Sequence, residues 1–134
     1  MAAPSTLSDL QVDFYGKNAF GTRSVVADQK ANATATATVT AAATETAYLD
    51  QVIVGGLGAT SATVVNLTIA GAVGNDISLP VTVPAGATLA LTTTVISFNP
   101  PLAGAALGDD ITVTLGAFGA GNTRANLVAI GHIV

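Results

Sequence analysis

The chain of 134 residues contains no cysteine and no tryptophan. The absence of cysteine excludes disulfide bonds, zinc–thiolate sites and cysteine nucleophiles. Aromatic residues make up only 4% of the sequence, so a core must be packed mainly from alanine, valine, leucine, isoleucine, glycine and threonine. Half of the residues are hydrophobic, which argues against intrinsic disorder over most of the chain and predicts one folded domain.

Charge is also scarce. Charged residues make up 9% of the sequence and the formal net charge is -4. A nucleic-acid-binding protein needs a basic stripe, so this balance argues against direct contact with nucleic acid. No run approaches the roughly 18 consecutive apolar residues of a membrane-spanning helix, and the first residues lack the pattern of a secretory signal. We therefore expect synthesis in the cytoplasm and no membrane partner.

The segment near the N-terminus differs from the rest. Residues 1–30 hold three of the six aromatic residues and three of the four basic residues. Because phenylalanine, tyrosine and arginine are enriched at interfaces, this segment supplies candidate partner-binding residues. They are Phe14, Tyr15, Phe20 and Arg23. The alternative is that these side chains attach the segment to its own domain. We predict an N-terminal arm over residues 1–33 and a β-sandwich domain over residues 34–134.

Apolar and polar residues alternate from residue 45 onward, which is the period of half-buried β-strands. The alternating alanine and threonine of residues 31–44 also fit a strand, although a flexible linker is the alternative because small side chains bury little area. Clusters rich in glycine and proline, such as Asn99, Pro100 and Pro101, are predicted to form turns between the runs. Strands are predicted near residues 34–41, 46–54, 61–70, 77–83, 88–98, 110–116 and 125–133. About seven or eight strands at this spacing predict an all-β fold, a jelly-roll-like antiparallel β-sandwich.

Two of the predicted strands have distinctive sequences. Pro80 cannot donate a backbone hydrogen bond, so the strand over residues 77–83 is predicted to lie at a sheet edge. The run over residues 127–134 is apolar on both faces, so one face can fill the sandwich while the other needs a second cover. That cover is the arm or another subunit. The predicted oligomer interface comprises Val128, Ile130, His132 and Val134.

Few residues could carry catalysis. His132 is the only histidine and lies in the most apolar run, where a buried or interface histidine is the commoner reading. Asp109 and Asp110 are adjacent, so in a strand their carboxylates point to opposite faces and make a poor cation site. Three further acids lie near turns without aromatic platforms for sugar stacking: Glu45, Asp50 and Asp76. We expect no enzymatic activity, no metal and no cofactor.

At residues 48–52 (YLDQV), 98–102 (FNPPL) and 117–122 (AFGAGN), the chain resembles small structural proteins of tailed-bacteriophage virions. These are the head decoration, or cement, proteins and the short head-fibre proteins. The likeness covers about residues 45–134 and rests on alternating strands rich in alanine, threonine and glycine. It implies a homotrimer on the outer capsid surface of the virion that clamps subunits of the major capsid protein, often through an N-terminal arm.

The sequence also allows a second function, that of a binding module. The chain could be a fibre or appendage module that recognises a glycan or protein on the host surface. A glycan site normally offers aromatic platforms and polar loops, and Tyr48 is the only tyrosine of the predicted domain. The structural role on the capsid is therefore the leading prediction.

Overall fold

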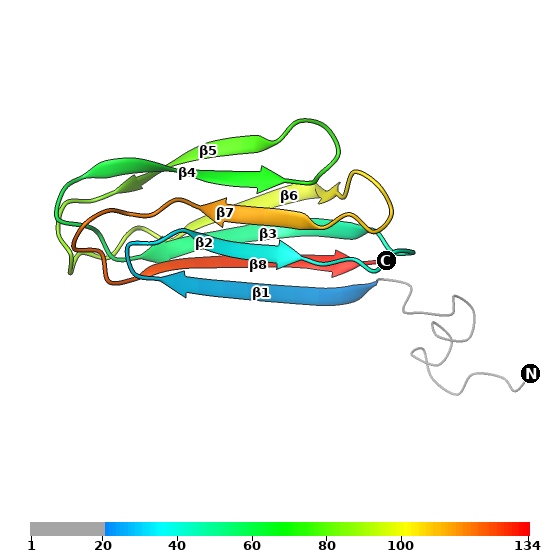
Figure 1. Cartoon of the computed structure of the whole chain (residues 1–134), viewed down its shortest axis with the longest axis horizontal. Coiled ribbons are helices and arrows are strands. Elements are labelled where there is room, and N and C mark those ends of the chain that lie inside the picture. Colours follow the sequence, from blue (N-terminus) through cyan, green and yellow to red (C-terminus); the bar gives the residue numbers. More distant parts are fainter. Residues whose placement is uncertain (1–20) are drawn as a thin grey trace, which may run out of the picture.

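The computed structural model describes residues 21–134, which form eight β-strands in two layers (Figure 1). The strands are β1 (Thr22–Lys30), β2 (Ala35–Val39), β3 (Ala47–Gly56), β4 (Thr63–Ala70), β5 (Ile77–Val83), β6 (Thr94–Ala103), β7 (Ile111–Leu115) and β8 (Ala125–Ile133). No α-helix occurs in this part of the chain, and so no helix there is long enough to cross a membrane. The predicted all-β sandwich is confirmed.

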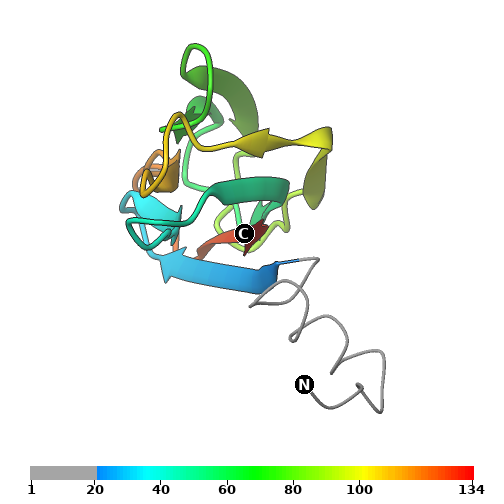
Figure 2. The ribbon, with the colours of Figure 1, turned by 90° about the vertical axis from the view of Figure 1, so that its right-hand side faces the viewer.

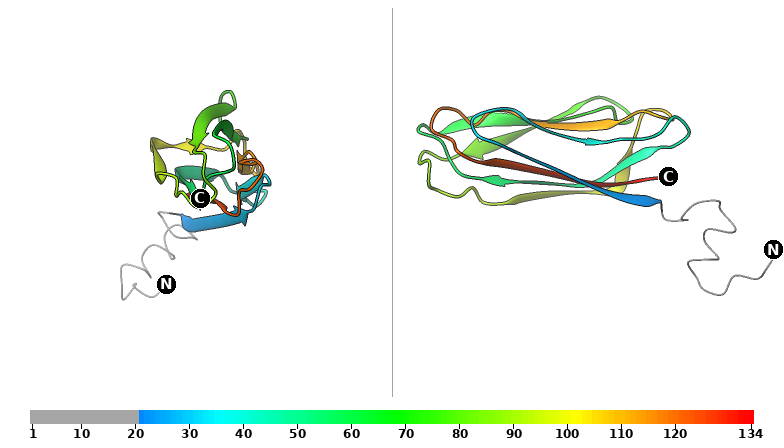
Figure 3. Two further views of the ribbon diagram at one scale, coloured as in Figure 1. Left: turned by 90° about the vertical axis from the view of Figure 1, so that its left-hand side faces the viewer. Right: turned by 60° about the horizontal axis from the view of Figure 1, so that its bottom comes forward.

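The strands divide equally between two antiparallel sheets. Sheet A has the order β1-β8-β3-β6 and sheet B the order β2-β7-β4-β5. The pairs are nested, because β1 pairs with β8, β2 with β7, β3 with β6 and β4 with β5. This nested order is consistent with the jelly-roll-like winding expected from the sequence. Figure 3 shows the two layers along the length of the sandwich, with the C-terminus at one end of sheet A.

The core lies between the inner faces of the sheets and is almost wholly aliphatic. Alternation places one residue in two on the inner face, as the buried positions Leu49, Val52 and Val54 of β3 illustrate. Phe118, in the loop after β7, is the only aromatic residue among the largest fully buried side chains of the described residues. It closes one end of an otherwise aliphatic interior.

The predicted arm of residues 1–33 is too long. Residues 22–30 form β1, which pairs with the whole of β8 and belongs to sheet A. Its inward positions include Ser24 and Asp28, so the apolar alternation that identifies other strands is weak here. In Figure 2, which looks along the strands, β1 (blue) lies beside β2 (cyan). This contact closes that side of the sandwich.

The predicted strand over residues 88–98 is displaced, since β6 begins at Thr94 and continues to Ala103. The turn expected at Asn99, Pro100 and Pro101 is wrong, because these residues lie inside β6. The register of β3 with β6 skips between Leu49 and Gln51. A bulged strand tolerates proline because the ladder is already interrupted there.

The prediction of an edge position for residues 77–83 is confirmed, since β5 is the last strand of sheet B. Pro80 lies opposite Asn66 of β4. The carbonyl of Asn66 accepts a hydrogen bond from the Gly116 N–H, and so it points away from β5. Pro80 and Asn66 are therefore a pair without hydrogen bonds, and the nitrogen of Pro80 points to the free edge. A proline in this position blocks unwanted strand addition.

Asp28 joins the two sheets where β1 meets β2. Its carboxylate accepts a hydrogen bond of 3.0 Å from the Thr36 N–H and lies 3.5 Å from the Lys30 ammonium. The Thr36 hydrogen bond, followed by Lys30, lowers the pKa of Asp28 below its usual value of 3.8. Because the folded-state pKa is the lower one, the carboxylate stabilises the fold above the unfolded-state pKa. This contribution is lost as the pH falls through the folded-state pKa.

We therefore expect Asp28→Asn to lower the thermal unfolding temperature slightly at neutral pH. The difference from the wild type should shrink below about pH 4, where the wild-type carboxylate also becomes neutral. Thermal unfolding of both proteins across this pH range, followed by circular dichroism, measures the effect. A difference that stays constant with pH would contradict this electrostatic account of the contact between β1 and β2.

Candidate functional site

The outer face of sheet A carries an apolar band that crosses all four strands. Val25 of β1 lies opposite Ile130 of β8. In the next row, Ile53 of β3 lies between Val128 of β8 and Val95 of β6. Val25 is 58% exposed and Val95 is 53% exposed. These valines and isoleucines form one continuous apolar surface that the described residues leave facing solvent.

The band exists because β8 is apolar on both faces. Its inner residues Leu127 and Ala129 are fully buried in the core. Val128, Ile130 and His132, three of the predicted interface residues, alternate with them and lie half-buried on the outer face. The fourth, Val134, follows the end of β8 and exchanges two backbone hydrogen bonds with Thr46.

A polar cluster lies at one end of the same face. The Nδ1 atom of His132 lies 2.8 Å from Oδ2 of Asp50. Asp50 is the extra residue of a β-bulge, since Leu49 pairs with Gly131 and Gln51 with Ile130. A bulge redirects the side chain of its additional residue. Here it turns the Asp50 carboxylate toward the imidazole of His132 across the strand boundary.

The ring of Tyr48 stacks on the face of the His132 imidazole. It lies opposite His132 in the register of β3 and β8. The two rings stack with their centroids 4.7 Å apart and an angle of 3° between their planes. Gly131 lets the backbones of β3 and β8 approach closely beside these rings, because a Cβ atom at that position would lie 2.1 Å from the Tyr48 carbonyl oxygen. The stacking and the hydrogen bond together restrict the orientation of the His132 ring.

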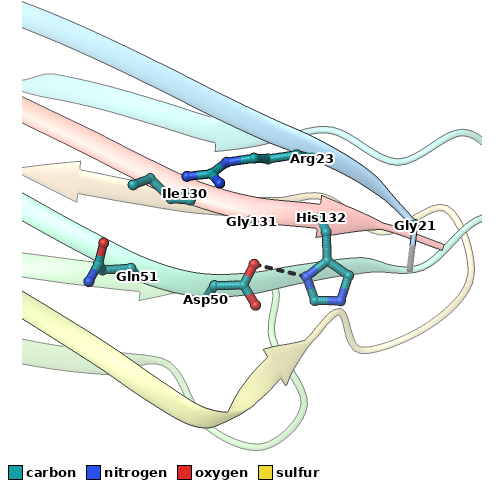
Figure 4. A pocket seen from close by; sticks show the side chains of 7 residues that line it. All are labelled: Gly21, Arg23, Asp50, Gln51, Ile130, Gly131 and His132. Carbon is teal, nitrogen blue, oxygen red and sulfur yellow. Dashed lines mark hydrogen bonds and ion pairs between the residues drawn. The ribbon is translucent and has the colours of Figure 1, made fainter.

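Beside this cluster is an open hollow of about 480 Å³ (Figure 4). Arg23 lies on β1 opposite His132, and its side chain extends along the near edge of β8 toward Ile130. Gly21, the first described residue, forms one end of the hollow. The ion pairs between described residues are Lys30 with Asp28 and His132 with Asp50, so Arg23 has no carboxylate partner among them.

The side chains of the cluster carry hydrogen-bond donors and acceptors that face the hollow. Asp50 orients one nitrogen of the imidazole, as in many acid–base sites, but no hydroxyl within residues 21–134 hydrogen-bonds to His132. In the same part of the chain, no three histidine, cysteine or acidic side chains are grouped so that they could hold a metal ion. Asp110 accepts a hydrogen bond of 2.9 Å from the Ala41 N–H, which gives it a structural role.

The structure brings together residues from two separate predictions, the partner-binding set and the oligomer interface. Of the predicted partner-binding residues, Phe14, Tyr15 and Phe20 lie outside the described residues. Arg23 itself shares the outer face of sheet A with the predicted interface residues of β8. The contact of Asp50 and Tyr48 with His132 was not predicted from the sequence. No local pattern could reveal it, because 82 positions separate Asp50 from His132.

The fold and this face define an all-β sandwich protein whose sheet A offers an apolar band with a polar cluster at one end. Comparison with models of known protein families and with curated protein sequences finds no match to the chain.

Proposed function

We propose that this chain is a structural protein of a tailed-phage virion, which decorates and stabilises the outer capsid surface as a homo-oligomer, with a trimer as the expected form. The observation that carries the proposal is the apolar band on the outer face of sheet A. Exposed β-branched residues in adjacent rows are typical of a surface that another protein covers. The proposed occupant of this face is a second copy of the chain.

The size of the face supports a modest contact between copies. The nine residues of β8 span about 30 Å at ~3.3 Å per residue, and four strands spaced by ~4.8 Å are about 19 Å wide. The resulting ~570 Å² is below the ~800 Å² that each partner buries in a standard interface. A weak contact is sufficient on a capsid, because many copies bind the same lattice and avidity multiplies each contribution.

Val25→Asp is expected to weaken self-association at least about tenfold, because it places a charge in the apolar band. Val64→Asp is the matched control. Val64 is 60% exposed, nearly the same as Val25 at 58%, but lies in β4 of sheet B, on its outer face. Sedimentation velocity over the micromolar to millimolar range measures association. Co-sedimentation with capsids of the phage that encodes the chain measures attachment.

The wild type and Val64→Asp should form oligomers and sediment with capsids, whereas Val25→Asp should be mainly monomeric and poorly retained. Deleting residues 2–20 tests whether the N-terminal residues, with Phe14, Tyr15 and Phe20, contribute to attachment. A wild-type protein that stays monomeric at millimolar concentration and does not sediment with capsids would overturn the proposal.

A second candidate function is a fibre or appendage module that binds a host-surface glycan or protein. The hollow beside His132 favours it, because Arg23, Asp50 and Gln51 offer hydrogen-bond donors and acceptors around an open space. The two functions differ in a direct measurement. Binding to cell-surface polysaccharide, abolished by Gln51→Ala, together with no retention on capsids, would favour the second function.

A further inference from the structure

Arg23 and Asp50 are the side chains of permanent opposite charge on the outer face of sheet A within the described residues. The rest of that face is apolar or neutral, as the paired rows of Val25 with Ile130 and Ile53 with Val95 illustrate. When a partner covers an apolar band, fixed charges beside it lose their hydration. This costs free energy unless each charge pairs with an opposite charge on the partner. Their arrangement therefore limits which partner can cover the face.

The two charges do not satisfy each other within one copy. Arg23 lies on β1 and Asp50 on β3, with β8 between them. Figure 4 shows the Arg23 side chain extending toward Ile130, while the Asp50 carboxylate is turned toward His132. Asp50 uses Oδ2 for that contact, and its side chain remains 35% exposed. Its Oδ1 atom has no hydrogen-bond partner within residues 21–134, so it can accept one from outside.

Building on the proposed self-association, we propose that the Arg23 guanidinium of one copy binds the Asp50 carboxylate of a neighbouring copy. One cation and one anion on the same face are self-complementary, because each copy supplies what the next one needs. The contact is repeated by symmetry in a dimer or in a closed ring. Guanidinium is the cation best suited to this pairing, since it is weakly hydrated and its planar fork matches a carboxylate.

The pair sets specificity and register. The apolar band alone could slide by a row or accept another apolar surface. A displaced register, or a partner without a matching carboxylate, would leave Arg23 buried and unpaired. The Tyr48 ring stacks on the imidazole of His132, and His132 in turn holds the Asp50 carboxylate through a hydrogen bond before association. Because the Asp50 carboxylate is preorganised, less conformational entropy is lost when the two copies associate.

Charge reversal tests the contact between copies. We expect Arg23→Glu alone and Asp50→Arg alone each to weaken self-association at least about tenfold, because each brings like charges together. Mixing the two single variants should recover mixed oligomers, because each contact between unlike copies pairs opposite charges; a mixed dimer regains both contacts and a mixed ring of three regains two of its three. The variant with both substitutions should recover association by itself. Sedimentation velocity of one variant carrying a fluorescent label, with and without the other, measures the mixed species.

Two controls separate this contact from structural effects. Asp50→Asn keeps a side-chain oxygen for His132 but removes the charge, so it should unfold at nearly the wild-type temperature and still associate more weakly. Lys30→Glu reverses a basic residue of the same strand whose partner is Asp28 in its own copy, and it should leave association unchanged.

The remaining outcomes are distinguishable. Recovery in the double variant without recovery on mixing would show a pair within one copy and overturn the proposal. Single variants that associate like the wild type, while Val25→Asp does not, would overturn the pair but leave the proposed function intact. A wild type that remains monomeric at every concentration would overturn the pair between copies, and one that also fails to sediment with capsids would overturn the proposed function as well.

Discussion

Asn122→Asp is expected to destabilise the fold by at least about 3 kcal/mol, although the two side chains have nearly the same shape. Asn122 is the buried polar residue of the described chain, with 5% of its surface exposed. Its Nδ2 atom donates to the carbonyl oxygens of Leu57, Gly58 and Arg124, at 2.7, 3.2 and 3.1 Å. Aspartate has no such donor and would place a carboxylate among three carbonyl oxygens.

The side-chain oxygen of Asn122 also stabilises the fold. Its Oδ1 atom accepts from the Asn32 N–H at 3.1 Å, and the Asn32 side chain in turn accepts from the Gly119 N–H at 3.0 Å. One amide thus joins the β1–β2 connection, the end of β3 and the β7–β8 loop. Asn126→Asp is the control, because Asn126 is half-buried on the outer face of sheet A.

Urea denaturation of the wild type, Asn122→Asp and Asn126→Asp measures the difference. The control should change the free energy of unfolding by no more than about 0.5 kcal/mol, as is usual for surface substitutions. Equal stability of the two variants would contradict the role assigned to the buried amide.

Phe118→Ala is expected to lower the free energy of unfolding by about 3–5 kcal/mol. Phe118 is fully buried in a core otherwise made of smaller aliphatic side chains. The loss combines the transfer free energy of the ring with the cavity that remains, because neighbouring strands cannot collapse to fill it. Domains of this size have a total stability of about 5–15 kcal/mol, so the variant should lose a large share of its stability.

Phe98→Ala is the matched control for this substitution. Phe98 lies in the edge strand β6 and is only partly buried against the core. Solvent and neighbouring side chains can occupy part of the space that its ring leaves, so a smaller loss is expected. Thermal and urea unfolding compare the two. A loss for Phe98→Ala as large as that for Phe118→Ala would show that the β6 side of the sandwich is as tightly packed as its closed end.

Much of the strand pattern could be predicted because strand formation leaves a local signal. The predicted ranges 77–83 and 125–133 coincide with the bounds of β5 and β8. Both have a period of two, which directs every second side chain to the core. The prediction of about seven or eight short strands in a β-sandwich follows from the same alternation and from the turns between the runs.

The wrong predictions for β1 and β6 also have specific causes. In β1, polar residues occupy positions near the sandwich edge, so its alternation is too weak to distinguish it from an arm. In β6, Pro100 and Pro101 lie in a strand because the register of β3 and β6 is interrupted beside them. From the sequence alone, such prolines are read as turn signals. The interrupted register that admits them to a strand depends on β3, which lies about fifty residues earlier in the chain.

By itself, the sequence determined that this chain forms an all-β sandwich with an aliphatic core, that β5 lies at an edge, and that β8 has two apolar faces. These properties depend on neighbouring residues and on a period of two, both of which are local. Only the tertiary structure decided that β8 lies between β1 and β3, and that a bulge turns Asp50 toward His132 beside Arg23. The physical reason is that strand order and register are set by pairing between distant segments, and shifting a register by one residue reverses the face of every side chain.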